Sequence, residues 1–491
     1  MTAVLALDQG TTGSTALVLS GDGRVLGRGY REFTQHFPAP GEVEHDAAEI
    51  LRVTLEAARE AIQQAKVTPA AIGITNQRET VCAWERETGH PVYRAIVWQD
   101  RRTAARCAQL EKQKKGALVR ARTGLVLDPY FSATKIEWLL EHVKGLRKRA
   151  KDGDVVFGTI DSWLIYRLTN GKTFATDHTN ASRTMLYDIG KRVWDRDLLA
   201  LFGVPREALP DVRKSSGNFG TAAAEHLGTE LPISGVAGDQ QAALFGQGCW
   251  KPGQAKNTYG TGAFLLLNTG TRRANSKRGL LTTLACGPRG EPVFALEGSV
   301  FIAGAAMQWL RDGLGIITRA AESDPLARSV EDTGGVYFVP AFVGLGAPHW
   351  EPNARGTIVG LTRGSSRAHL VRAALEAMAF STKDVLDAMQ ADARLKLSSL
   401  LVDGGAAAND WLMQFQADVL GVTVARPDLV ETTALGAAGL AGLGAGLWKS
   451  ADDFLAGRMF TRFHPSLQRR AVQARAGEWH RAVQTALHWA G

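Results

Sequence analysis

The apolar positions of the chain alternate with polar turns in the manner of a mixed α/β protein. Residues 4–7 are a short apolar run typical of a buried strand, residues 8–13 are polar and rich in glycine, and residues 14–19 are apolar again. This order predicts a β-hairpin with a long polar tip. Residues 46–66 show helical spacing of apolar positions, and residues 71–75 indicate a further strand.

A similar order returns in the second half of the chain. Residues 255–267 predict a strand, a turn rich in glycine and threonine, and a strand, and residues 400–403 predict a strand that ends in a glycine pair. The chain of 491 residues is too long for one core, so we expect two related α/β domains at 1–246 and 247–491. Ligands of such folds bind in the crevice at the carboxyl ends of strands, which here predicts a site between the two domains.

Composition narrows the class of protein. The chain is 45% hydrophobic and 22% charged, which is ordinary for a globular protein. Its net charge of +8 favours anionic ligands, but the basic residues are scattered. The densest run, residues 147–151, is typical of a solvated helix end, so we expect no nucleic-acid partner.

The sequence favours a cytoplasmic protein over an exported or membrane-spanning one. The four cysteines include no C-x-x-C pair and are expected to stay reduced in the cytoplasm. The first residues lack the basic segment and cleavage site of a signal peptide. The uncharged stretch 432–448 is 17 residues long, short for a membrane span, and its glycine and alanine content predicts a tightly packed buried helix.

Two turns are suited to phosphate. In DQGTTGST, residues 8–15, Gly10 and Gly13 would let backbone N–H groups approach a phosphate, and neighbouring threonines would add hydroxyl donors. Asp8 at the strand end could hold Mg²⁺, through water. The same logic applies to NTYGTGAF, residues 257–264, and two such turns could grip one triphosphate. The alternative is a polar hairpin tip in each case.

Three further segments carry candidate chemistry. In GVAGDQQAALFGQG, Asp239 precedes a predicted helix and could accept a proton from an alcohol as a general base, or simply act as an N-cap. In ITNQRET, Arg78 and Glu79 offer both a donor and an acceptor to polyol hydroxyls, although a salt-bridged strand end is the alternative. In VDGGAAAND, the glycines could admit a base or ribose and Asn409 could bind a purine edge, although an ordinary strand–helix turn has the same pattern.

These segments together resemble the FGGY carbohydrate kinases, which share the actin-like, hexokinase-like ATPase fold. The two segments that match the signatures of that family are YFSATKIEWLLEH, residues 130–142, and GTIVGLTRGSSRAHLVRAALE, residues 356–376. Within the family, the chain is similar to the enzymes that phosphorylate glycerol. The strings that carry this similarity are GITNQRET, AIVWQ, TGLVLDPYFS, TNASRTML, ISGVAGDQQAALFGQ, KNTYGTG, ALEGSVF, GLGAPHW and VDGGAAAN.

The resemblance implies an α/β fold of two actin-like (ribonuclease H-like) ATPase domains with an active-site cleft between them, and the transfer of phosphate from ATP to glycerol. The implied glycerol-binding residues are Arg78, Glu79, Trp98, Tyr130, Asp239, Gln240 and Phe264. The implied nucleotide-binding residues are Thr11, Thr12, Gly260, Thr261, Gly304, Gln308, Gly405 and Asn409. Asp239 would be the general base and, with Asp8, would position Mg²⁺. The N-terminal domain would bind the polyol and phosphate, and the C-terminal domain would bind the nucleotide. The enzyme would be a homodimer or homotetramer.

The chain departs from the family pattern in several places. It has Gly13 where a serine is usual and Thr15 where an arginine is usual, so one phosphate contact is missing or supplied elsewhere, and we expect activity to survive. Glu230 stands where a sugar bisphosphate site would need arginine, and residues 466–479 lack the glutamate that helps bind a phosphocarrier protein. We therefore expect neither allosteric control. His226 is expected to be an ordinary loop histidine rather than a phosphorylation site.

Three other functions are compatible with parts of this pattern. A kinase of another polyol or ketose, such as erythritol or xylulose, would need the same phosphate turns. A non-catalytic ATP-binding module could share the fold, although it would not need the polyol-matched polar set. A dehydrogenase is weaker still, since the Gly-rich tract 436–446 lacks G-x-G-x-x-G.

Overall fold

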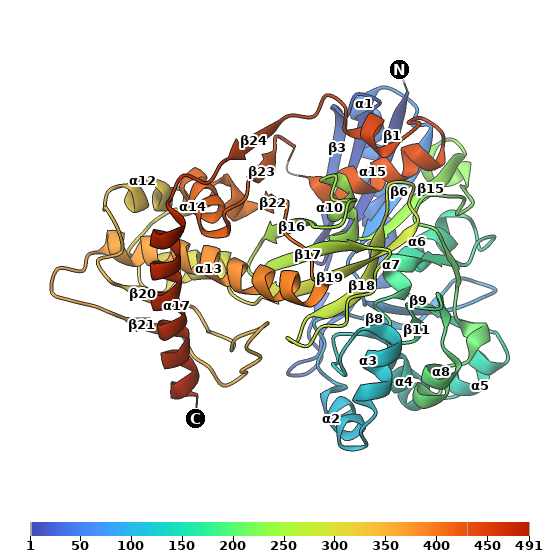
Figure 1. The fold of residues 1–491 in the computed structure, drawn as a ribbon. Helices are drawn as coiled ribbons and strands as arrows, with labels where there is room; N and C mark the ends of the chain where they lie inside the picture. Colours follow the sequence, from blue (N-terminus) through green and yellow to red (C-terminus); the bar gives the residue numbers. More distant parts are fainter. Residues whose placement is uncertain (1, 430, 491) are drawn as a thin grey trace. The chain divides into compact units, whose positions relative to one another are not determined.

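The computed structural model describes residues 2–429 and 431–490, which divide into two compact units. The first unit contains residues 2–250, 282–294 and 431–457. The second contains residues 251–281, 295–429 and 458–490. Each unit is therefore built from segments that are far apart along the chain (Figure 1).

The first unit is organised around a mixed sheet in the order β14–β15–β6–β1–β2–β3. Its strands are β1 (Ala3–Gln9), β2 (Gly13–Ser20), β3 (Val25–Glu32), β6 (Ala71–Asn76), β14 (Thr221–Ala222) and β15 (Leu231–Gly238). The strands β1, β2 and β3 are antiparallel to one another, whereas β6 and β15 run parallel to β1. The predicted hairpin is confirmed, but its polar tip is shorter than expected because Asp8 already pairs with Thr15 in the ladder.

Two helices that pack on this sheet were predicted from the sequence. The helix α1 (Ala47–Ala65) packs against β3 and β2, and the side chain of Asp46 caps it by accepting from the backbone N–H of Ala48 at 2.8 Å. The helix α15 (Thr432–Gly444) packs against β15, β6 and β1, and its central turns are buried. The expected buried helix over 432–448 is therefore confirmed, although it ends at Gly444.

Small residues let α15 approach its neighbours closely. A Cβ added at Gly436 would lie 1.8 Å from the carbonyl oxygen of Ala242 in α10 (Asp239–Gly246), and one added at Gly73 of β6 would lie 2.2 Å from the carbonyl oxygen of Ala437. Because real side chains never come that close to backbone, both positions require glycine. The backbone of α10, which begins with Asp239, is thus in direct contact with the backbone of α15.

The rest of the first unit surrounds this sheet. A second sheet has the order β4–β5–β8–β7–β9, and two short pairs are formed by β10 with β13 and by β11 with β12. The strands are β4 (Gln35–His36), β5 (Glu44–His45), β7 (Val81–Glu85), β8 (Pro91–Ile96), β9 (Val155–Gly158), β10 (Ala175–Asp177), β11 (Tyr187–Asp188), β12 (Val193–Trp194) and β13 (Asp211–Arg213). The helices are α2 (Ala104–Lys112), α3 (Gly116–Thr123), α4 (Ser132–His142), α5 (Leu146–Lys151), α6 (Ile160–Leu168), α7 (His178–Ala181), α8 (Arg196–Phe202), α9 (Ala224–Leu227) and α16 (Ala451–Leu455), with the 3₁₀ turn η1 (Arg206–Ala208).

The second unit repeats the sheet order of the first. The strand β16 is antiparallel to β17 and parallel to β22, and β22 is parallel to β23, in a seven-stranded sheet of order β18–β19–β17–β16–β22–β23–β24. The strands wholly within the second unit are β16 (Gln254–Tyr259), β17 (Ala263–Gly270), β20 (Tyr337–Val339), β21 (Thr357–Val359), β22 (Ser399–Gly404), β23 (Val424–Pro427) and β24 (Phe460–Phe463). The other two strands of the sheet, β18 (Leu281–Cys286) and β19 (Pro292–Val300), include residues of the segment 282–294 that is grouped with the first unit. Thus β16 takes the place of β1, β17 of β2, β22 of β6 and β23 of β15, which confirms the repeat that the sequence predicted.

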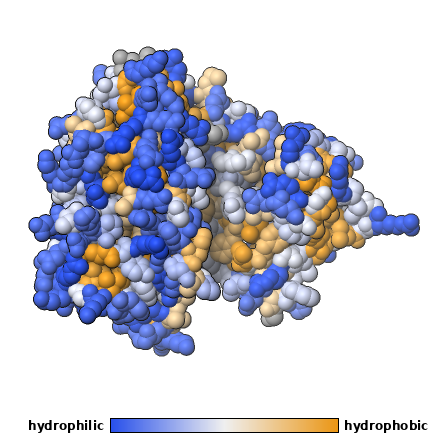
Figure 2. Space-filling view, turned by 180° about the vertical axis from the view of Figure 1, so that it is seen from behind, coloured by the Kyte–Doolittle hydropathy of each residue, from blue (hydrophilic) through white to orange (hydrophobic). Residues whose placement is uncertain are grey.

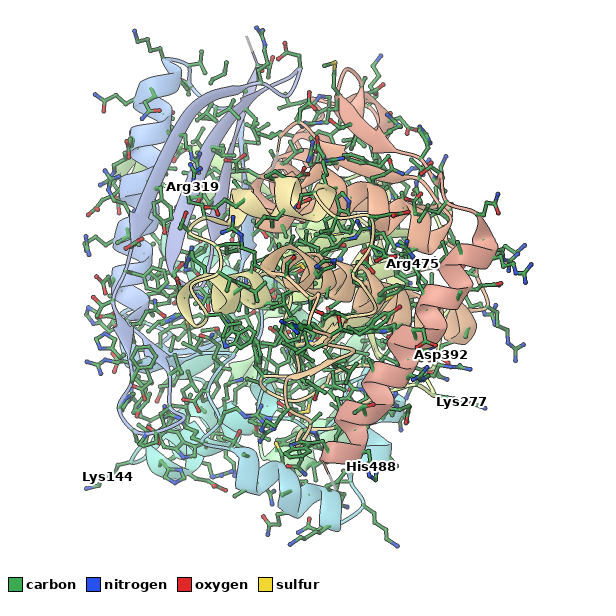
Figure 3. All side chains as sticks on the ribbon, turned by 90° about the vertical axis from the view of Figure 1, so that its left-hand side faces the viewer. Lys144, Lys277, Arg319, Asp392, Arg475 and His488 are labelled. Carbon is green, nitrogen blue, oxygen red and sulfur yellow. The ribbon has the colours of Figure 1, made fainter. Side chains whose placement is uncertain are left out.

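The helices of the second unit enclose its hydrophobic core. They are α11 (Gly304–Asp312), α12 (Ser323–Arg328), α13 (Arg367–Ala393), α14 (Asp410–Leu420) and α17 (Arg469–Trp489), with the 3₁₀ turns η2 (Ala320–Glu322) and η3 (Gly405–Ala408). The long α13 contributes apolar side chains to this core along most of its length. Near the end of α13, Asp392 accepts from the Arg278 guanidinium at 2.6 Å and from the backbone N–H of Lys277 at 3.2 Å. These contacts fix the loop that contains Lys277 and Arg278 on the helix (Figure 3).

Within the described part of the chain, no helix combines the length and the apolar character needed to cross a bilayer. Figure 2 shows hydrophilic residues over much of the visible face, with hydrophobic residues gathered in smaller groups.

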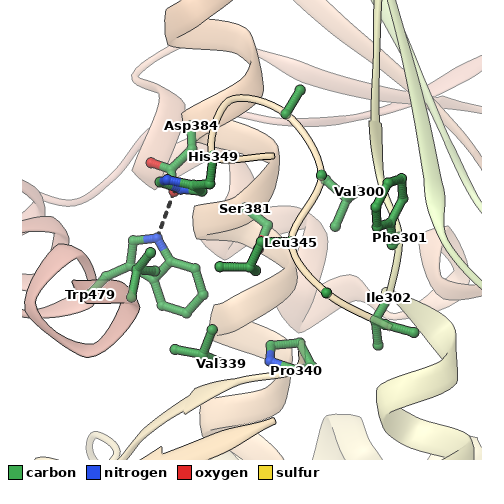
Figure 4. A pocket seen from close by; sticks show the side chains of 14 residues that line it. Val300, Phe301, Ile302, Val339, Pro340, Leu345, His349, Ser381, Asp384 and Trp479 are labelled. Atoms are coloured by element: carbon green, nitrogen blue, oxygen red, sulfur yellow. Dashed lines mark hydrogen bonds and ion pairs between the residues drawn. The ribbon is translucent and has the colours of Figure 1, made fainter. Parts of the chain in front are cut away.

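A pocket in the second unit has an ionic contact at one end. Its walls come from β19, the loop after β20, α13 and α17, and its lining includes His349, Asp384 and Trp479 (Figure 4). The Asp384 carboxylate accepts from Trp479 Nε1 at 2.8 Å and from His480 Nε2 at 3.0 Å. Burial would raise the pKa of Asp384, but hydrogen bonds from His349, His480 and Trp479 outweigh burial and lower that pKa. The hydrogen bond to Asp384 raises the pKa of His480.

The contact between α13 and α17 should therefore weaken as the pH rises. A histidine whose pKa is raised in the folded state adds stability below its unfolded pKa, and that stability is lost as the pH rises through the folded pKa. Replacing His480 by Gln should remove this pH-dependent part, so that the melting temperatures of the wild type and the variant converge between about pH 6 and about pH 8.5. The matched control is His488→Gln, an exposed position on the same helix. A difference between His480→Gln and the wild type that stays constant over this range would contradict the assignment.

The close contact between α10 and α15 makes a second prediction. Gly436→Ala should overpack this contact, lower the free energy of unfolding by about 1–3 kcal/mol and displace α10. Gly477→Ala is the control, because its Cβ would meet nothing within 4 Å on the exposed face of α17. That change should stabilise its helix by about 0.5–1 kcal/mol. Thermal unfolding of both variants checks the expectation, which fails if the two changes have the same sign.

Candidate active site

The turn that follows β6 carries two of the predicted polyol-binding residues. Because β6 lies between the parallel β15 and β1, this turn leaves the sheet at the edge where their carboxyl ends also meet. It is tied to the end of β1, since the backbone N–H of Gln77 donates to Gln9 O at 2.7 Å and Gln77 Nε2 donates to Gly10 O at 3.1 Å. The Thr80 hydroxyl donates to Gln77 Oε1 at 2.9 Å. The turn is thus fixed by hydrogen bonds to the end of β1 and by a hydrogen bond between its own residues Thr80 and Gln77.

Arg78 is the residue at which the elements of the first unit meet. Its side chain is 2% exposed, and its Nε lies 3.3 Å from Asp239 Oδ1 and 3.6 Å from Glu79 Oε1. Its terminal nitrogens donate to Gln241 Oε1 at 3.2 Å and to the Tyr130 hydroxyl at 3.3 Å. One guanidinium therefore links the end of β6, the start of α10 and the segment before α4.

Glu79 occupies a backbone conformation that is uncommon for a residue with a side chain. Its φ is +64°, and its side chain is 1% exposed. The Ser132 hydroxyl donates to Glu79 O at 3.0 Å, and Arg183 Nε donates to Glu79 Oε1 at 2.6 Å. Non-glycine residues persist at positive φ where surrounding contacts impose that conformation, and such positions cluster at functional sites.

Aromatic side chains border this polar group. Trp98 and Tyr130 pack edge to face with ring centroids 5.6 Å apart. Trp98 Nε1 donates to Thr11 Oγ1 at 3.0 Å, which connects the aromatic pair to the first Gly/Thr turn. The buried Lys135 Nζ donates to Tyr130 O at 2.6 Å. Burial lowers the pKa of Lys135 to about 7.

Asp239 is the first residue of α10, and Gly238 before it holds the N-cap position. Its side chain is 31% exposed, so the carboxylate is accessible from outside. The backbone N–H of Gln240 donates to Asp239 Oδ1 at 2.6 Å, and the backbone N–H of Gly238 donates to Thr179 Oγ1 at 2.9 Å. The half-buried Gln240 is thus placed beside Asp239 by the same helix start.

Asp8 is the second predicted carboxylate of the site. Burial, and then repulsion from the charge of Asp239, raise the pKa of Asp8 to about 7. The two carboxylates therefore interact, as expected for residues at the ends of neighbouring strands and helices. No group of three or more His, Cys, Asp or Glu suited to a metal ion occurs among residues 2–429 and 431–490.

The first Gly/Thr turn explains one departure from the family pattern. The backbone N–H of Gly10 donates to Gly13 O at 2.9 Å, and Thr12 is exposed at the tip. A Cβ at position 13 would lie 2.7 Å from Arg31 O and 2.7 Å from the ring of Tyr30. Glycine is therefore required here as long as Tyr30 packs across the hairpin.

The second Gly/Thr turn lies in the second unit and has a similar internal bond. The backbone N–H of Gly260 donates to Gly262 O at 2.8 Å. The first residues of α11 dock on this turn, since the N–H of Gly304 donates to Gly260 O at 3.0 Å and that of Ala305 donates to Thr261 O at 3.0 Å. Gln308 is exposed one turn further along α11.

The remaining candidates of the second unit lie at the end of β22 and in β17. Gly404 has φ +83°, and a Cβ at Gly405 would meet nothing within 4 Å, so the turn has an open side. Asn409 caps α14 by accepting from the N–H of Leu412 at 2.8 Å, and its Nδ2 donates to Ser323 Oγ at 3.0 Å. Its side chain therefore has the capping role of an ordinary strand–helix turn, and contact with a purine edge stays a prediction. Phe264 is half-buried in β17.

Sequence reasoning missed residues that hold the predicted ones in place. Gln241 receives a hydrogen bond from Arg78 and donates to Leu284 O at 3.1 Å. Arg183 pairs with Glu79, and Lys135 binds the backbone of Tyr130. Each lies inside a segment that carried the family resemblance, but the pattern alone does not say which predicted residue each one touches.

Comparisons with known proteins identify the family. The model of the FGGY family of carbohydrate kinases, N-terminal domain, matches residues 3–246, and the model of its C-terminal domain matches residues 255–445. The chain belongs to the FGGY family of carbohydrate kinases. This membership confirms the predicted two-domain FGGY fold.

FGGY relatives match the chain over its whole length. Glycerol kinase 2 of Thermotoga maritima is 54% identical over 490 residues, which is 99% of both chains. A glycerol kinase of Carboxydothermus hydrogenoformans is 55% identical over 99% of this chain and 98% of its own. Among solved structures, the Plasmodium falciparum glycerol kinase with ADP superposes with a TM-score of 0.95 and 37% identity, over 99% of this chain and 98% of its own.

The raised pKa of Asp8 predicts that this site costs stability at neutral pH. Because the folded protein holds the proton of Asp8 more tightly than the unfolded chain does, its stability falls as the pH rises from about 4 to about 7. Asp8→Asn cannot lose a proton, so its melting temperature should rise relative to the wild type across this window and stay level above it.

A matched carboxylate tests this prediction. Asp22 is exposed on the next hairpin, and the hydrogen bond from Ser20 lowers its pKa. Asp22→Asn should therefore give a constant difference from the wild type between about pH 5 and about pH 8. The Asp8 assignment fails if Asp8→Asn also gives a constant difference.

Proposed function

We propose that this FGGY kinase phosphorylates glycerol with ATP to give sn-glycerol 3-phosphate and ADP, with Asp239 as general base. The observation that carries the proposal is the convergence on Arg78 of Asp239, Glu79 and the Tyr130 hydroxyl. A compact set of one cation, two carboxylates and a phenol suits a small molecule with several hydroxyl groups. The full-length similarity to proteins named glycerol kinases supports the choice of substrate.

The polyol would be held by both donors and acceptors. Arg78 would donate to its oxygens and Glu79 would accept from a hydroxyl, while Trp98, Tyr130 and Phe264 would pack against its carbon atoms. Gln240 would supply a further polar contact next to the base. The buried ion pairs of Arg78 and Glu79 hold these groups in place before substrate arrives, which is the preorganisation that favours catalysis.

Asp239 would accept the proton of the attacking hydroxyl. Its partial exposure leaves it reachable, and Arg78 Nε lies 3.3 Å from its Oδ1 and would hold the carboxylate in place. Phosphoryl transfer depends mainly on positioning and charge stabilisation, so a modest base that orients the alcohol is sufficient.

The acid pair fits a magnesium ion. Asp8 carries a pKa raised to about 7, partly by repulsion from Asp239, and a divalent cation would relieve that repulsion. Mg²⁺ is commonly held by one or two carboxylates together with substrate phosphates, as these two residues would allow. When bound, the ion would neutralise charge on the transferred phosphate.

The nucleotide would be held by residues on both Gly/Thr turns and by the second unit. Thr11, Thr12, Gly260 and Thr261 would bind the phosphates, and the remaining nucleotide contacts would come from Gly304, Gln308, Gly405 and Asn409. The glycine turns keep backbone N–H groups accessible, which is the feature that phosphate binding needs. The matched Plasmodium falciparum structure contains ADP, which supports ATP as the donor.

Two further proposals, on the domains and on the oligomeric state, follow from the resemblance alone. We propose that residues 1–246 bind the polyol and phosphate and that residues 247–491 bind the nucleotide. We propose a homodimer or homotetramer as the working state. A cytoplasmic location agrees with the four buried free cysteines, Cys82, Cys107, Cys249 and Cys286.

Asp239→Asn tests the role of the base. The variant should bind nucleotide as the wild type does but lose glycerol-dependent ADP release by about 10²–10⁴-fold, because the hydroxyl proton has no acceptor. The measurement is a coupled ADP assay with ATP, Mg²⁺ and glycerol, with a sample without glycerol as background. Asp197→Asn, an exposed acid in the first turn of α8, is the matched control and should keep full activity. Unchanged turnover in Asp239→Asn would exclude this residue as the base.

The same assay decides the substrate. Glycerol, erythritol and xylulose should be compared at equal concentrations, and glycerol should give the highest kcat/KM. A pentulose with a clearly higher kcat/KM would replace glycerol, and nucleotide binding without alcohol-dependent turnover would favour a non-catalytic module.

A further inference from the structure

We propose that Arg183 is a positioning residue that fixes the Glu79 carboxylate, ionised and oriented, so that it accepts a hydrogen bond from one hydroxyl of the polyol. The proposal rests on the proposed function and adds a residue that does not itself touch the substrate. Four observations in the first unit support it: the contact of Arg183 with Glu79, the backbone of Glu79, the anchoring of Arg183 and the sharing of Arg78.

The contact between Arg183 and Glu79 is short and buried. Arg183 Nε donates to Glu79 Oε1 at 2.6 Å, with the two side chains 0% and 1% exposed. The guanidinium also lies over the rings of Phe131 and Tyr130, at 5.2 and 5.7 Å from their centroids. A buried ion pair gives little net stability because both charges lose their hydration, so fixing a geometry is the better explanation for its presence here.

The backbone of Glu79 needs such support. At φ +64° this residue is in a left-handed conformation that costs energy for a side chain with a Cβ. The Ser132 hydroxyl holds its carbonyl oxygen, and Arg183 holds its carboxylate. The carboxylate is thus directed by contacts at both ends of the residue.

Arg183 is itself anchored to the strand from which Glu79 extends. Asp177 caps α7 by accepting from the N–H of Asn180 at 2.9 Å, and the N–H of Arg183 donates to Asn180 O at 3.0 Å. The side-chain amides of Asn180 and Asn76, the last residue of β6, donate to each other at 3.1 Å in both directions. These buried hydrogen bonds of Asp177, Asn180 and Asn76 therefore fix the distance between the backbone of Arg183 and the turn that carries Glu79.

The pairing also leaves Arg78 available to Asp239. Arg78 Nε lies 3.3 Å from Asp239 Oδ1 and 3.6 Å from Glu79 Oε1, so the two acids share this cation. Without Arg183, the charge of Glu79 would draw Arg78 away from Asp239. The carboxylates of both Glu79 and Asp239 would then be displaced.

The test compares glycerol with alcohols that lack one hydroxyl. Arg183→Met should lower kcat/KM for glycerol about 100-fold, the typical effect of misplacing a binding group. One of the two diols, propane-1,2-diol or propane-1,3-diol, lacks the hydroxyl that donates its hydrogen bond to Glu79. For that diol, Arg183→Met should lower kcat/KM much less than it does for glycerol. An equal loss for all three alcohols would show a merely structural role and overturn the proposal.

A double variant tests whether Arg183 acts through Glu79. Arg183→Met alone leaves a buried carboxylate with one partner fewer, whereas Glu79→Gln with Arg183→Met removes both charges and should fold even if the single variant does not. If Arg183 acts only through Glu79, the double variant and Glu79→Gln should have the same kcat/KM for glycerol. A further loss of about tenfold or more in the double variant would contradict the proposal.

Arg102→Met is the matched control. Arg102 is also buried, with its side chain 3% exposed, paired with Asp100 at 2.9 Å and stacked on the ring of Trp138 at 4.6 Å. Its loss should lower the melting temperature without changing the ratio of kcat/KM between glycerol and the diols. A wild type that uses none of the three alcohols would instead contradict the proposed function, and the same comparison would then be made with the sugar that it does phosphorylate and the corresponding deoxy sugars.

Discussion

The arrangement of the first unit depends on the parallel pairing of β15, β6 and β1. Parallel neighbours end at the same edge of a sheet, so the residues that follow them are brought together whatever their separation in sequence. Asp8 comes from β1, Arg78 and Glu79 from the turn after β6, and Asp239 from the helix after β15. The close contact of α10 with α15 holds the last of these in place, since glycine and alanine allow their backbones to touch. The site is thus a consequence of topology before it is a matter of individual side chains.

The electrostatics of this edge are unfavourable to the folded protein alone and favourable to ligands. Asp8 and Lys135 both have pKa values shifted toward neutrality by burial, to about 7 in each case, and Asp8 is further affected by Asp239. Two acids share Arg78, and Arg183 neutralises one of them. A cation and a polyol would satisfy charges and hydrogen-bonding groups that the protein holds in place at a cost to its own stability.

Much of the fold could be predicted from the sequence because local patterns agree with it. The sequence favours strands at the apolar runs of β1 and β2, a helix at the helical spacing of α1, and a buried helix at the Gly/Ala-rich α15. Tertiary packing stabilises the same secondary structure at each of these segments. The exact tip of the first hairpin could not be predicted, because Asp8 and Thr15 are polar residues that continue the ladder. Motif matching found Arg78, Glu79 and Asp239, but it could not find that Gln241 and Arg183 hold them. Those contacts join segments more than a hundred residues apart, and only the folded chain shows them.

The second unit shows that topology does not determine the chemistry at a sheet edge. Both units place a Gly/Thr turn between their first two strands, and both continue with parallel strands in the same order. Yet the turn after β6 carries Arg78 and Glu79, whereas the equivalent strand β22 ends in the glycine pair 404–405, with an open side. Glycines suit the close approach of a flat group, and an ion-paired arginine suits hydroxyls, so the equivalent strand ends of the two copies suit different groups. The glycine and threonine turn is common to both copies, and the residues that follow the next parallel strand distinguish one copy from the other.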